Sequence, residues 1–305
     1  MVDADAPLLR LLSWLKARDY RFTAITPESH ARVIGRPFTG PASLRDIFGW
    51  NRTFDPAEVE PELLEMMRAA DLIEGTDEFS RSRLRVASLG EDLFLHSGFP
   101  TEDADAVFFG PDTYRFAEFI RDQVGALPDA PAALLDMGTG SGAGGIFAAR
   151  LLPETAVTLV DINPQALRLA EVNAAFAGVP AVCRSARTVP DGQDLIIANP
   201  PYMIDAGQRA YRDGGDLYGG KVALDWARQA LHALNSGGTL LLYTGACVVD
   251  GATPLIEALG QLSADQHAML SVRERDPDVF GEELSNPAYA EVERIAVLEI
   301  VLRKA

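Results

Sequence analysis

Short apolar runs alternate with segments of helical periodicity through the last two thirds of the chain. A typical helical segment is PQALRLAEVNAAFAG, residues 164–178, in which apolar residues recur at the spacing of one helix face. The alternation predicts a mostly parallel sheet with helices on both faces, because parallel strands are joined by helical crossovers. We therefore expect the α/β class with a Rossmann-like, seven-stranded sheet, built from the runs ALLDM, AVTLVD, AVCRS, DLIIA, GTLLLYTG, AMLSVRE and RIAVLEIVLR.

The last two of these runs have no helical pattern between them. We expect them to form an antiparallel pair at the end of the sheet, so that the last strand is antiparallel. Residues 274–294 join the two runs, and their length suggests a flap over a site. An ordinary surface loop is the alternative for this segment.

The pattern changes near residue 105, and 305 residues are enough for two domains. Residues 1–105 are expected to form a small helical domain with a hairpin, because APLLRLLSWLKARDY has helical spacing and two strand-like runs flank Leu89-Gly90-Glu91. Helices followed by a hairpin suggest a winged-helix-like module that binds a substrate or partner. Residues 106–305 then form the Rossmann-like domain.

The chain is acidic, with a net charge of −17 and a pI near 4.6. Broad electrostatic binding to nucleic acid is not expected, because it relies on Lys and Arg to neutralise phosphates. A local basic patch is the alternative: Arg81, Arg83 and Arg85 would share one face of a strand by period-two geometry. Such a face is either solvated or a contact for phosphates or an acidic partner.

Composition favours a packed protein in the cytoplasm. Hydrophobic residues make up 48% of the chain, which is enough for a core. Cys183 and Cys247 are too few for a disulfide framework, so we expect a reducing compartment. The N-terminal sequence starts acidic and lacks a long apolar run, so neither a secretory signal nor a membrane partner is expected. The four histidines show no ligand spacing, and no metal is expected.

A glycine-rich segment, DMGTGSGAGG, follows the first predicted strand of the sheet. Gly138, Gly140 and Gly142 remove side chains where a ligand would approach the backbone at the start of a helix. Gly140, Gly142 and Gly145 also match the dinucleotide pattern G-x-G-x-x-G. Asp161 ends the next strand, where a carboxylate can accept hydrogen bonds from ribose hydroxyls. A nicotinamide dinucleotide and an adenosyl sulfonium would both satisfy these features.

Asp136 favours the adenosyl sulfonium. It stands two residues before Gly138, where its carboxylate would repel a pyrophosphate placed over the loop. A ligand with a cationic amino-acid end suits this position. The alternative role for Asp136 is a cap of the loop or helix.

The segment IIANPPYM, residues 196–203, ends a buried strand with an amide, two prolines and an aromatic ring. The Asn199 side-chain oxygen can accept one N–H of a planar amine or amide, and the Pro200 carbonyl can accept another. Pro201 keeps that backbone rigid, and Tyr202 can stack on the flat face of the substrate. The target nitrogen is then held with its lone pair free to attack, so the predicted chemistry is mainly positioning.

These motifs, in the order DMGTGSGAGG, LVDINPQALRLAEVNA and NPPY, resemble those of class I S-adenosylmethionine-dependent methyltransferases. They are most similar to the N-methylating branch, which includes the release-factor glutamine methyltransferases and several adenine-N6 methyltransferases. The resemblance covers residues 108–305. FGPDTYRFAEFI is similar to the proline-acid-threonine entry segment of the glutamine methyltransferases, and Asp112 or Thr113 is expected to cap the helix that follows.

The resemblance implies S-adenosyl-L-methionine as the cofactor and assigns residues to it by position. The residues implied in cofactor binding are Asp136, Gly138, Thr139, Gly140, Gly142, Asp161, Ile162 and Asn199. Of these, Asp161 would bind the ribose hydroxyls and Ile162 would pack against the adenine. The residues implied in catalysis are Asn199, Pro200 and Tyr202, which would hold the target nitrogen.

Two features depart from the family pattern. Where the family often places an acid near the adenine amino group, this chain has Ser185, Ala186 and Arg187. The N-terminal residues also lack a clear match to the helical substrate-binding domain of the release-factor enzymes.

The resemblance favours a protein glutamine side chain as the methyl acceptor. The alternatives are adenine-N6 methylation of RNA or DNA, a small-molecule acceptor, and a non-catalytic cofactor-binding protein. Five residues after NPPY are candidates to contact the substrate: Arg209, Tyr211, Arg212, Asp213 and Asp216.

Overall fold

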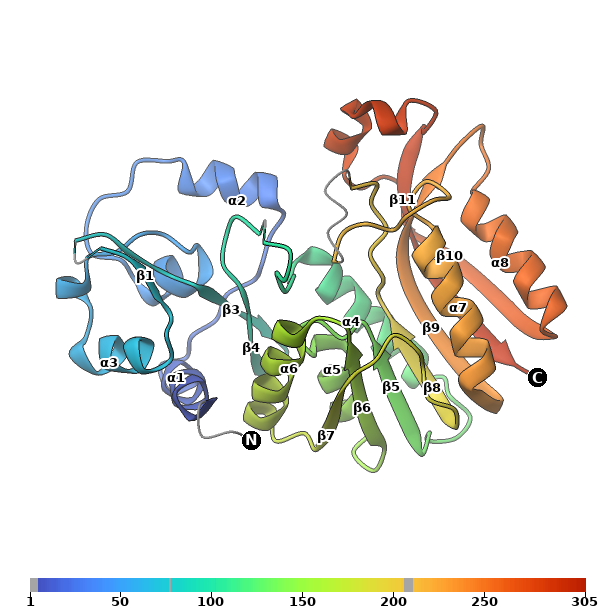
Figure 1. Ribbon diagram of the computed structural model, residues 1–305, viewed down its shortest axis with the longest axis horizontal. Helices are drawn as coiled ribbons and strands as arrows, with labels where there is room; N and C mark the ends of the chain where they lie inside the picture. The colour runs from blue at the N-terminus through green and yellow to red at the C-terminus, as the bar shows by residue number, and fades with distance from the viewer. Residues whose placement is uncertain (1–4, 77, 102, 206–210) are drawn as a thin grey trace.

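The computed structural model describes residues 5–76, 78–101, 103–205 and 211–305 (Figure 1). Its largest element is a seven-stranded sheet with strand order β10-β11-β9-β8-β5-β6-β7, and the N-terminal residues form a smaller part beside it. The strands of the sheet are β5 (Ala133–Met137), β6 (Ala156–Asp161), β7 (Ala181–Ser185), β8 (Gln193–Ala198), β9 (Leu234–Val248), β10 (Ala268–Asp276) and β11 (Arg294–Lys304).

Strands β5 to β9 pair in parallel, whereas β11 is antiparallel to both β9 and β10. This confirms the predicted α/β class, the seven-stranded, mostly parallel sheet and the antiparallel last strand. The antiparallel pair of β10 and β11 lies at the end of the sheet, as predicted. Because β5, β6 and β8 are parallel neighbours, their carboxyl ends meet at one edge of the sheet.

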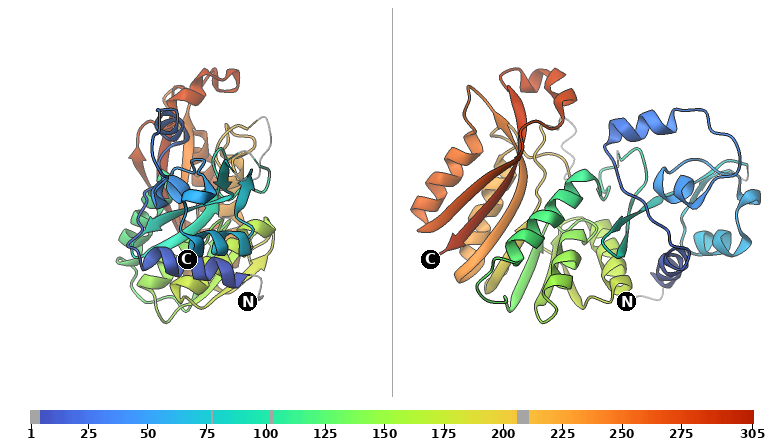
Figure 2. Two further views of the ribbon diagram at one scale, coloured as in Figure 1. Left: turned by 90° about the vertical axis from the view of Figure 1, so that its left-hand side faces the viewer. Right: turned by 180° about the vertical axis from the view of Figure 1, so that it is seen from behind.

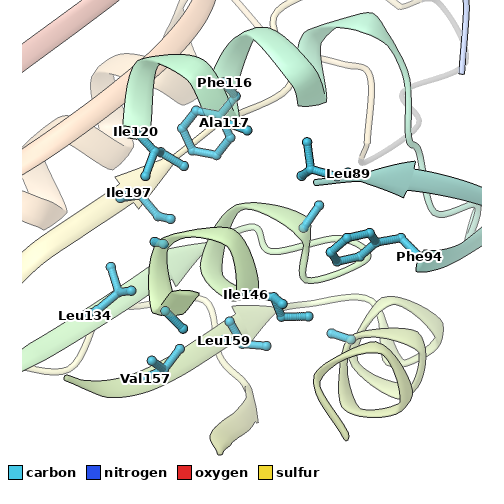
Figure 3. Close-up of a cluster of buried hydrophobic side chains, with 14 of the residues drawn as sticks. Leu89, Phe94, Phe116, Ala117, Ile120, Leu134, Ile146, Val157, Leu159 and Ile197 are labelled. Atoms are coloured by element: carbon cyan, nitrogen blue, oxygen red, sulfur yellow. The ribbon is translucent and has the colours of Figure 1, made fainter. Parts of the chain in front are cut away.

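Helices cover both faces of the sheet, as Figure 1 and the reverse view in Figure 2 show. Along each strand, successive side chains point to opposite faces, so Leu134 packs with α4 and α5 while Leu135 packs with α7 and α8. Figure 3 shows the first of these cores, in which Phe116 and Ile120 lie over Leu134. The helices are α4 (Pro111–Val124), α5 (Ala143–Leu151), α6 (Pro164–Ala177), α7 (Lys221–Ala233) and α8 (Pro254–Asp265).

The N-terminal part combines short helices with two hairpins. Its hairpins pair β1 with β2 and β3 with β4, and the predicted turn at Gly90-Glu91 joins the second pair. The elements are α1 (Ala6–Lys16), α2 (Pro27–Ile34), η2 (Arg45–Gly49), η3 (Pro56–Glu58), α3 (Pro61–Ala69), β1 (Ile73–Gly75), β2 (Ser80–Ser82), β3 (Leu84–Leu89) and β4 (Asp92–Ser97). The winged-helix-like assignment and the division at residue 105 stay predictions.

The β3-β4 hairpin joins the N-terminal part to the sheet. Val86 and Leu95 pack in the N-terminal core, which also contains Leu169 of α6. Leu89 and Phe94 pack instead in the core under α4 and α5, where Figure 3 shows them. The hairpin therefore has one face in each core.

The predicted arginine face is wrong. Arg83 lies at a bend between β2 and β3, so Arg81 and Arg85 belong to different strands. The Arg85 guanidinium is buried and donates to the Ser97 carbonyl, whereas Arg81 pairs with Glu74 at 2.5 Å. The period-two argument assumed one continuous strand, and the bend at Arg83 ends it.

Within the residues that the structure describes, no helix has both the length and the apolar character needed to span a membrane.

Candidate active site

A cavity of about 470 Å³ opens at the carboxyl ends of β5, β6 and β8. Ligands of open α/β sheets bind at this edge, and the volume is typical of a small-molecule site. The cavity brings together residues of all three sequence motifs. Of the site residues predicted from sequence, those that line it are Asp136, Gly138, Thr139, Gly140, Asp161, Ile162, Asn199, Pro200 and Tyr202.

The glycine loop after β5 has a left-handed backbone at three positions. The angle φ is +68° at Gly138, +54° at Gly140 and +82° at Gly142. A Cβ at Gly138 would lie 2.3 Å from the Trp226 ring, so no other residue fits there. Gly142 is not a lining residue; it precedes α5, and a Cβ there would meet Ala170. The predicted contact of Gly142 with the cofactor stays a prediction.

The side chain of Asp136 hydrogen-bonds to both the glycine loop and the start of α5. Its Oδ2 accepts hydrogen bonds from Thr139 Oγ1 at 2.6 Å and from the Gly145 N–H at 2.8 Å. Burial raises the pKa of Asp136 to about 6, although both hydrogen bonds favour the ionised form. The carboxylate thus performs the capping role that was its alternative assignment, and it also lines the cavity.

Asp161 joins the glycine loop to the turn after β6. Its Oδ2 accepts from the Gly140 N–H at 2.9 Å, and its Oδ1 accepts from the Asn163 N–H at 2.9 Å. Ile162 follows on the cavity wall and is 43% exposed. An exposed isoleucine beside a carboxylate gives this wall an apolar surface next to a hydrogen-bond acceptor.

The segment after β7 completes that wall without an acidic side chain. Ala186, Arg187, Thr188 and Val189 line the cavity, whereas Ser185 does not. The place where the resemblance implied an acid is therefore occupied by small, apolar, polar and basic side chains.

Asn199 follows β8 directly and is half-buried on the cavity wall. Within the described part of the chain, its side-chain amide has no hydrogen-bond partner, so its oxygen is available to a ligand. Pro200 beside it is buried. The strand end therefore presents a free amide next to a proline whose backbone torsion is restricted.

Tyr202 is held from several sides. Its hydroxyl donates to Asp112, and its ring centroid lies 6.1 Å from that of Phe280. A Cβ at Gly245 would lie 2.3 Å from the Tyr202 ring, so β9 approaches the ring as closely as a glycine allows. The ring can move little without displacing one of these neighbours.

Of the two residues predicted to cap α4, Thr113 does so and Asp112 does not. Gly110 precedes the helix, and its N–H donates to Thr113 Oγ1 at 3.3 Å. Asp112 is 5% exposed and turns inward to the phenols of Tyr202 and Tyr243. Thr113 therefore caps from inside the helix, and Asp112 belongs to the site instead.

Several lining residues were not predicted from sequence. Their local sequence carries no signal of a site, so only the fold places them here. The principal ones are Pro27, Phe108, Phe116, Val222 and Trp226.

The segment after NPPY and the predicted flap both reach the cavity. Tyr211, Arg212 and Asp213 line it, whereas Asp216 does not, and Arg209 lies outside the described residues. Phe280 brings the flap segment to the wall. Closure of the flap stays a prediction. In the described ranges, no group of three or more His, Cys, Asp or Glu residues could hold a metal ion.

Comparison with known proteins gives consistent matches. Residues 124–247 match the family model of the methyltransferase small domain. The release factor glutamine methyltransferase of Deinococcus radiodurans is 31% identical over 249 residues, which cover 76% of this chain and 84% of that protein. The Geobacter sulfurreducens protein of the same name is 36% identical over 137 residues, 39% of this chain and 48% of that one.

A solved structure shares the fold. The crystal structure of Trm5b from Pyrococcus abyssi superposes with a TM-score of 0.50 at 17% identity, covering 81% of this chain and 68% of that one.

Proposed function

Since this chain belongs to the release factor glutamine methyltransferase family, we propose that it methylates the side-chain amide nitrogen of a glutamine residue in a protein. The chain is a class I S-adenosyl-L-methionine-dependent N-methyltransferase. The observation that supports transfer to a planar nitrogen is the unpartnered Asn199 amide, within the described residues, on the wall of the cavity that also contains the glycine loop. The choice of glutamine rests on the relatives.

The cavity fits the cofactor. Gly140 leaves open space where a Cβ would stand, Asp161 offers acceptor oxygens, and Ile162 offers an exposed apolar surface. We propose that the glycine loop holds the methionine part, that Asp161 binds the ribose hydroxyls and that Ile162 packs on the adenine. When bound, the cofactor supplies an electrophilic methyl group on a sulfonium together with the leaving group.

The NPPY residues would hold the acceptor. An amide nitrogen is a weak nucleophile because its lone pair is delocalised into the carbonyl. The Asn199 oxygen and the Pro200 carbonyl can each accept one of its two N–H groups, and the Tyr202 ring can pack on the amide plane. Holding the nitrogen in this way directs it at the methyl group, and positioning is then the main source of rate.

A protein acceptor suits the walls of the cavity. Pro27 and Ala104 of the N-terminal part line it together with NPPY, so a peptide segment could touch both parts. Nucleic acid is disfavoured by the net charge of −17 and by the intramolecular contacts of Arg81 and Arg85. We propose that residues 1–105 bind the substrate or a partner. We also propose that the protein acts in the cytoplasm, as expected from its two cysteines.

The test uses lysate from a strain that lacks the protein, incubated with the purified protein and tritiated S-adenosylmethionine, and then separated into protein, nucleic-acid and small-molecule fractions. Label in the protein fraction is expected with the unaltered chain and with Asn235→Ala, a surface control. Asn199→Ala should label the protein fraction at least about a hundredfold more slowly. Label confined to nucleic acid or to small molecules would reject glutamine as the acceptor.

A further inference from the structure

We propose that Asp112 is a positioning residue for methyl transfer, because its buried carboxylate fixes the ring of Tyr202 at the angle at which it packs on the acceptor. The inference rests on the proposed function, since it assigns a purpose to the ring. It adds a residue outside the NPPY motif to the machinery that holds the acceptor.

The contacts of Asp112 connect three distant segments. Its Oδ2 accepts from the hydroxyl of Tyr202 after β8, and its Oδ1 accepts from that of Tyr243 in β9 at 3.0 Å. Arg115, one turn further along α4, lies 3.6 Å from Oδ1 and also bonds to Asp276 at 2.9 Å. The carboxylate thereby ties the entry helix to the acceptor motif.

The buried carboxylate of Asp112 is stabilised by the groups around it, so it can hold the Tyr202 hydroxyl in place. Asp112 lies in the first turn of α4, where the helix dipole favours a negative charge, and two phenols and a guanidinium surround it. Burial and the Asp112 charge raise the pKa of Tyr202 and of Tyr243 well above the usual range, so both hydroxyls remain donors. Only a carboxylate offers two acceptor oxygens of this kind in so short a side chain.

The backbone of Tyr202 is fixed by other elements, and the hydroxyl bond to Asp112 adds to the contacts of Phe280 and Gly245 that orient the ring. A Cβ at Gly219 would lie 2.3 Å from the Tyr202 carbonyl oxygen, and one at Gly214 would lie 2.8 Å from its Cα. Close packing of this kind fixes the position of the Tyr202 backbone. The hydrogen bond to Asp112 fixes the position of the hydroxyl at the far end of the ring, and without this bond the buried hydroxyl would lack its acceptor.

The orientation of the ring matters because Tyr202 forms part of the cavity wall. Tyr202 and Asp112 both line the cavity, so a tilt of the ring changes the space in which the acceptor amide lies. Displacements on the order of 1 Å in an aligned acceptor cost up to about a hundredfold in rate. The hydrogen bonds that hold the glycine loop and Asp161, to which we assign the cofactor, involve neither Asp112 nor Tyr202, so cofactor binding is expected to be unaffected.

The test compares Asp112→Ala, Tyr202→Phe and the double variant with Asp122→Ala, an exposed aspartate on the same helix. Three quantities are measured: the thermal unfolding midpoint of the unliganded protein, the affinity for S-adenosylhomocysteine, and kcat and KM with the acceptor that the unaltered protein labels. Tyr202→Phe keeps the ring and removes only the hydroxyl, so it serves if Asp112→Ala fails to fold.

Each single variant should lower kcat roughly tenfold or more and leave the affinity for S-adenosylhomocysteine within about twofold of that of the unaltered protein. The kcat of the double variant should be no lower than that of the slower single variant. The double variant should lower the thermal unfolding midpoint by less than the sum of the decreases in the two single variants. Full turnover of either single variant, or multiplicative losses, would overturn the proposal. A labelled acceptor other than glutamine would reject the proposed function while leaving this comparison valid.

Discussion

The side-chain amide of Asn173 hydrogen-bonds to both backbone groups of Leu95. Its oxygen accepts from the Leu95 N–H at 2.9 Å and its nitrogen donates to the Leu95 carbonyl at 3.1 Å. The same nitrogen donates to the carbonyl of Ser141, in the glycine loop, at 2.9 Å. One residue of α6 therefore joins the N-terminal hairpin to the loop that we assign to the cofactor.

Asn173→Ala should weaken both stability and cofactor binding. The substitution leaves three backbone groups without this partner at a fully buried site, which should lower the free energy of unfolding by about 3 kcal/mol. Affinity for S-adenosylhomocysteine should also fall, because the Ser141 carbonyl loses its donor. Urea unfolding and calorimetric titration measure the two effects.

The control for this substitution is Asn235→Ala. Asn235 is exposed and bonds to the side chain of Asp194, so its loss should cost at most about 1 kcal/mol. Equal decreases in the free energy of unfolding of the two variants would show that the three hydrogen bonds of Asn173 do not stabilise the protein more than one surface hydrogen bond does.

Cofactor affinity should depend on pH through Asp136. Burial raises the pKa of this carboxyl from 3.8 to about 6, so the unliganded protein protonates it as the pH falls through 6. The cofactor's cationic amino group favours the ionised form, and protonation therefore competes with binding. The dissociation constant for S-adenosylhomocysteine should rise below pH 6, towards about tenfold per pH unit.

Asp136→Asn supplies the comparison for the pH profile. Its affinity should be lower at pH 8 and nearly constant down to pH 5, because the titrating group is gone. A flat profile for the unaltered protein would contradict the placement of Asp136 near a cationic ligand group.

Gly245→Ala should reduce turnover without reducing cofactor affinity. The new Cβ would lie 2.3 Å from the Tyr202 ring and would push the ring into the cavity. We expect kcat to fall at least tenfold, on the scale of other misplaced acceptor groups. Gly260→Ala is the matched control, because its Cβ would meet nothing within 4 Å on α8. Unchanged kcat in Gly245→Ala would mean that the position of the Tyr202 ring is unimportant.

Asn199→Ala should chiefly reduce turnover. The variant removes an acceptor for the amide N–H and leaves the glycine loop and Asp161 intact, so kcat should fall by about a hundredfold or more. The affinity for S-adenosylhomocysteine, measured by calorimetry, should remain within about threefold. If cofactor affinity is abolished instead, Asn199 belongs to the cofactor site and not to the acceptor site.

The sheet could be predicted from sequence because its signals are local. Leu134 and Leu135 lie in different cores, yet both appear in one continuous apolar run that is typical of a strand buried on both faces. The glycine loop and the NPPY segment could be placed as well, because each follows such a run and the carboxyl ends of parallel strands meet.

The remaining site residues could not be predicted because long-range contacts decide their roles. Asp112 reads as a helix cap, but it meets Tyr243, 131 residues further along the chain. Trp226 reads as helix core, although its ring packs on Gly138. Arg85 reads as a surface residue of an alternating strand, but it is 5% exposed. In each case a tertiary partner outweighs the local pattern.

The most direct test of the account is the chemical form of the transferred methyl group. Protein labelled by the unaltered chain with tritiated S-adenosylmethionine is hydrolysed in acid, and volatile amines are collected. An N-methylated glutamine amide releases labelled methylamine on hydrolysis, and this is the predicted result, together with at least about a hundredfold less release after Asn199→Ala. Label that stays on an amino acid, or that leaves as methanol, would contradict methylation of a side-chain amide.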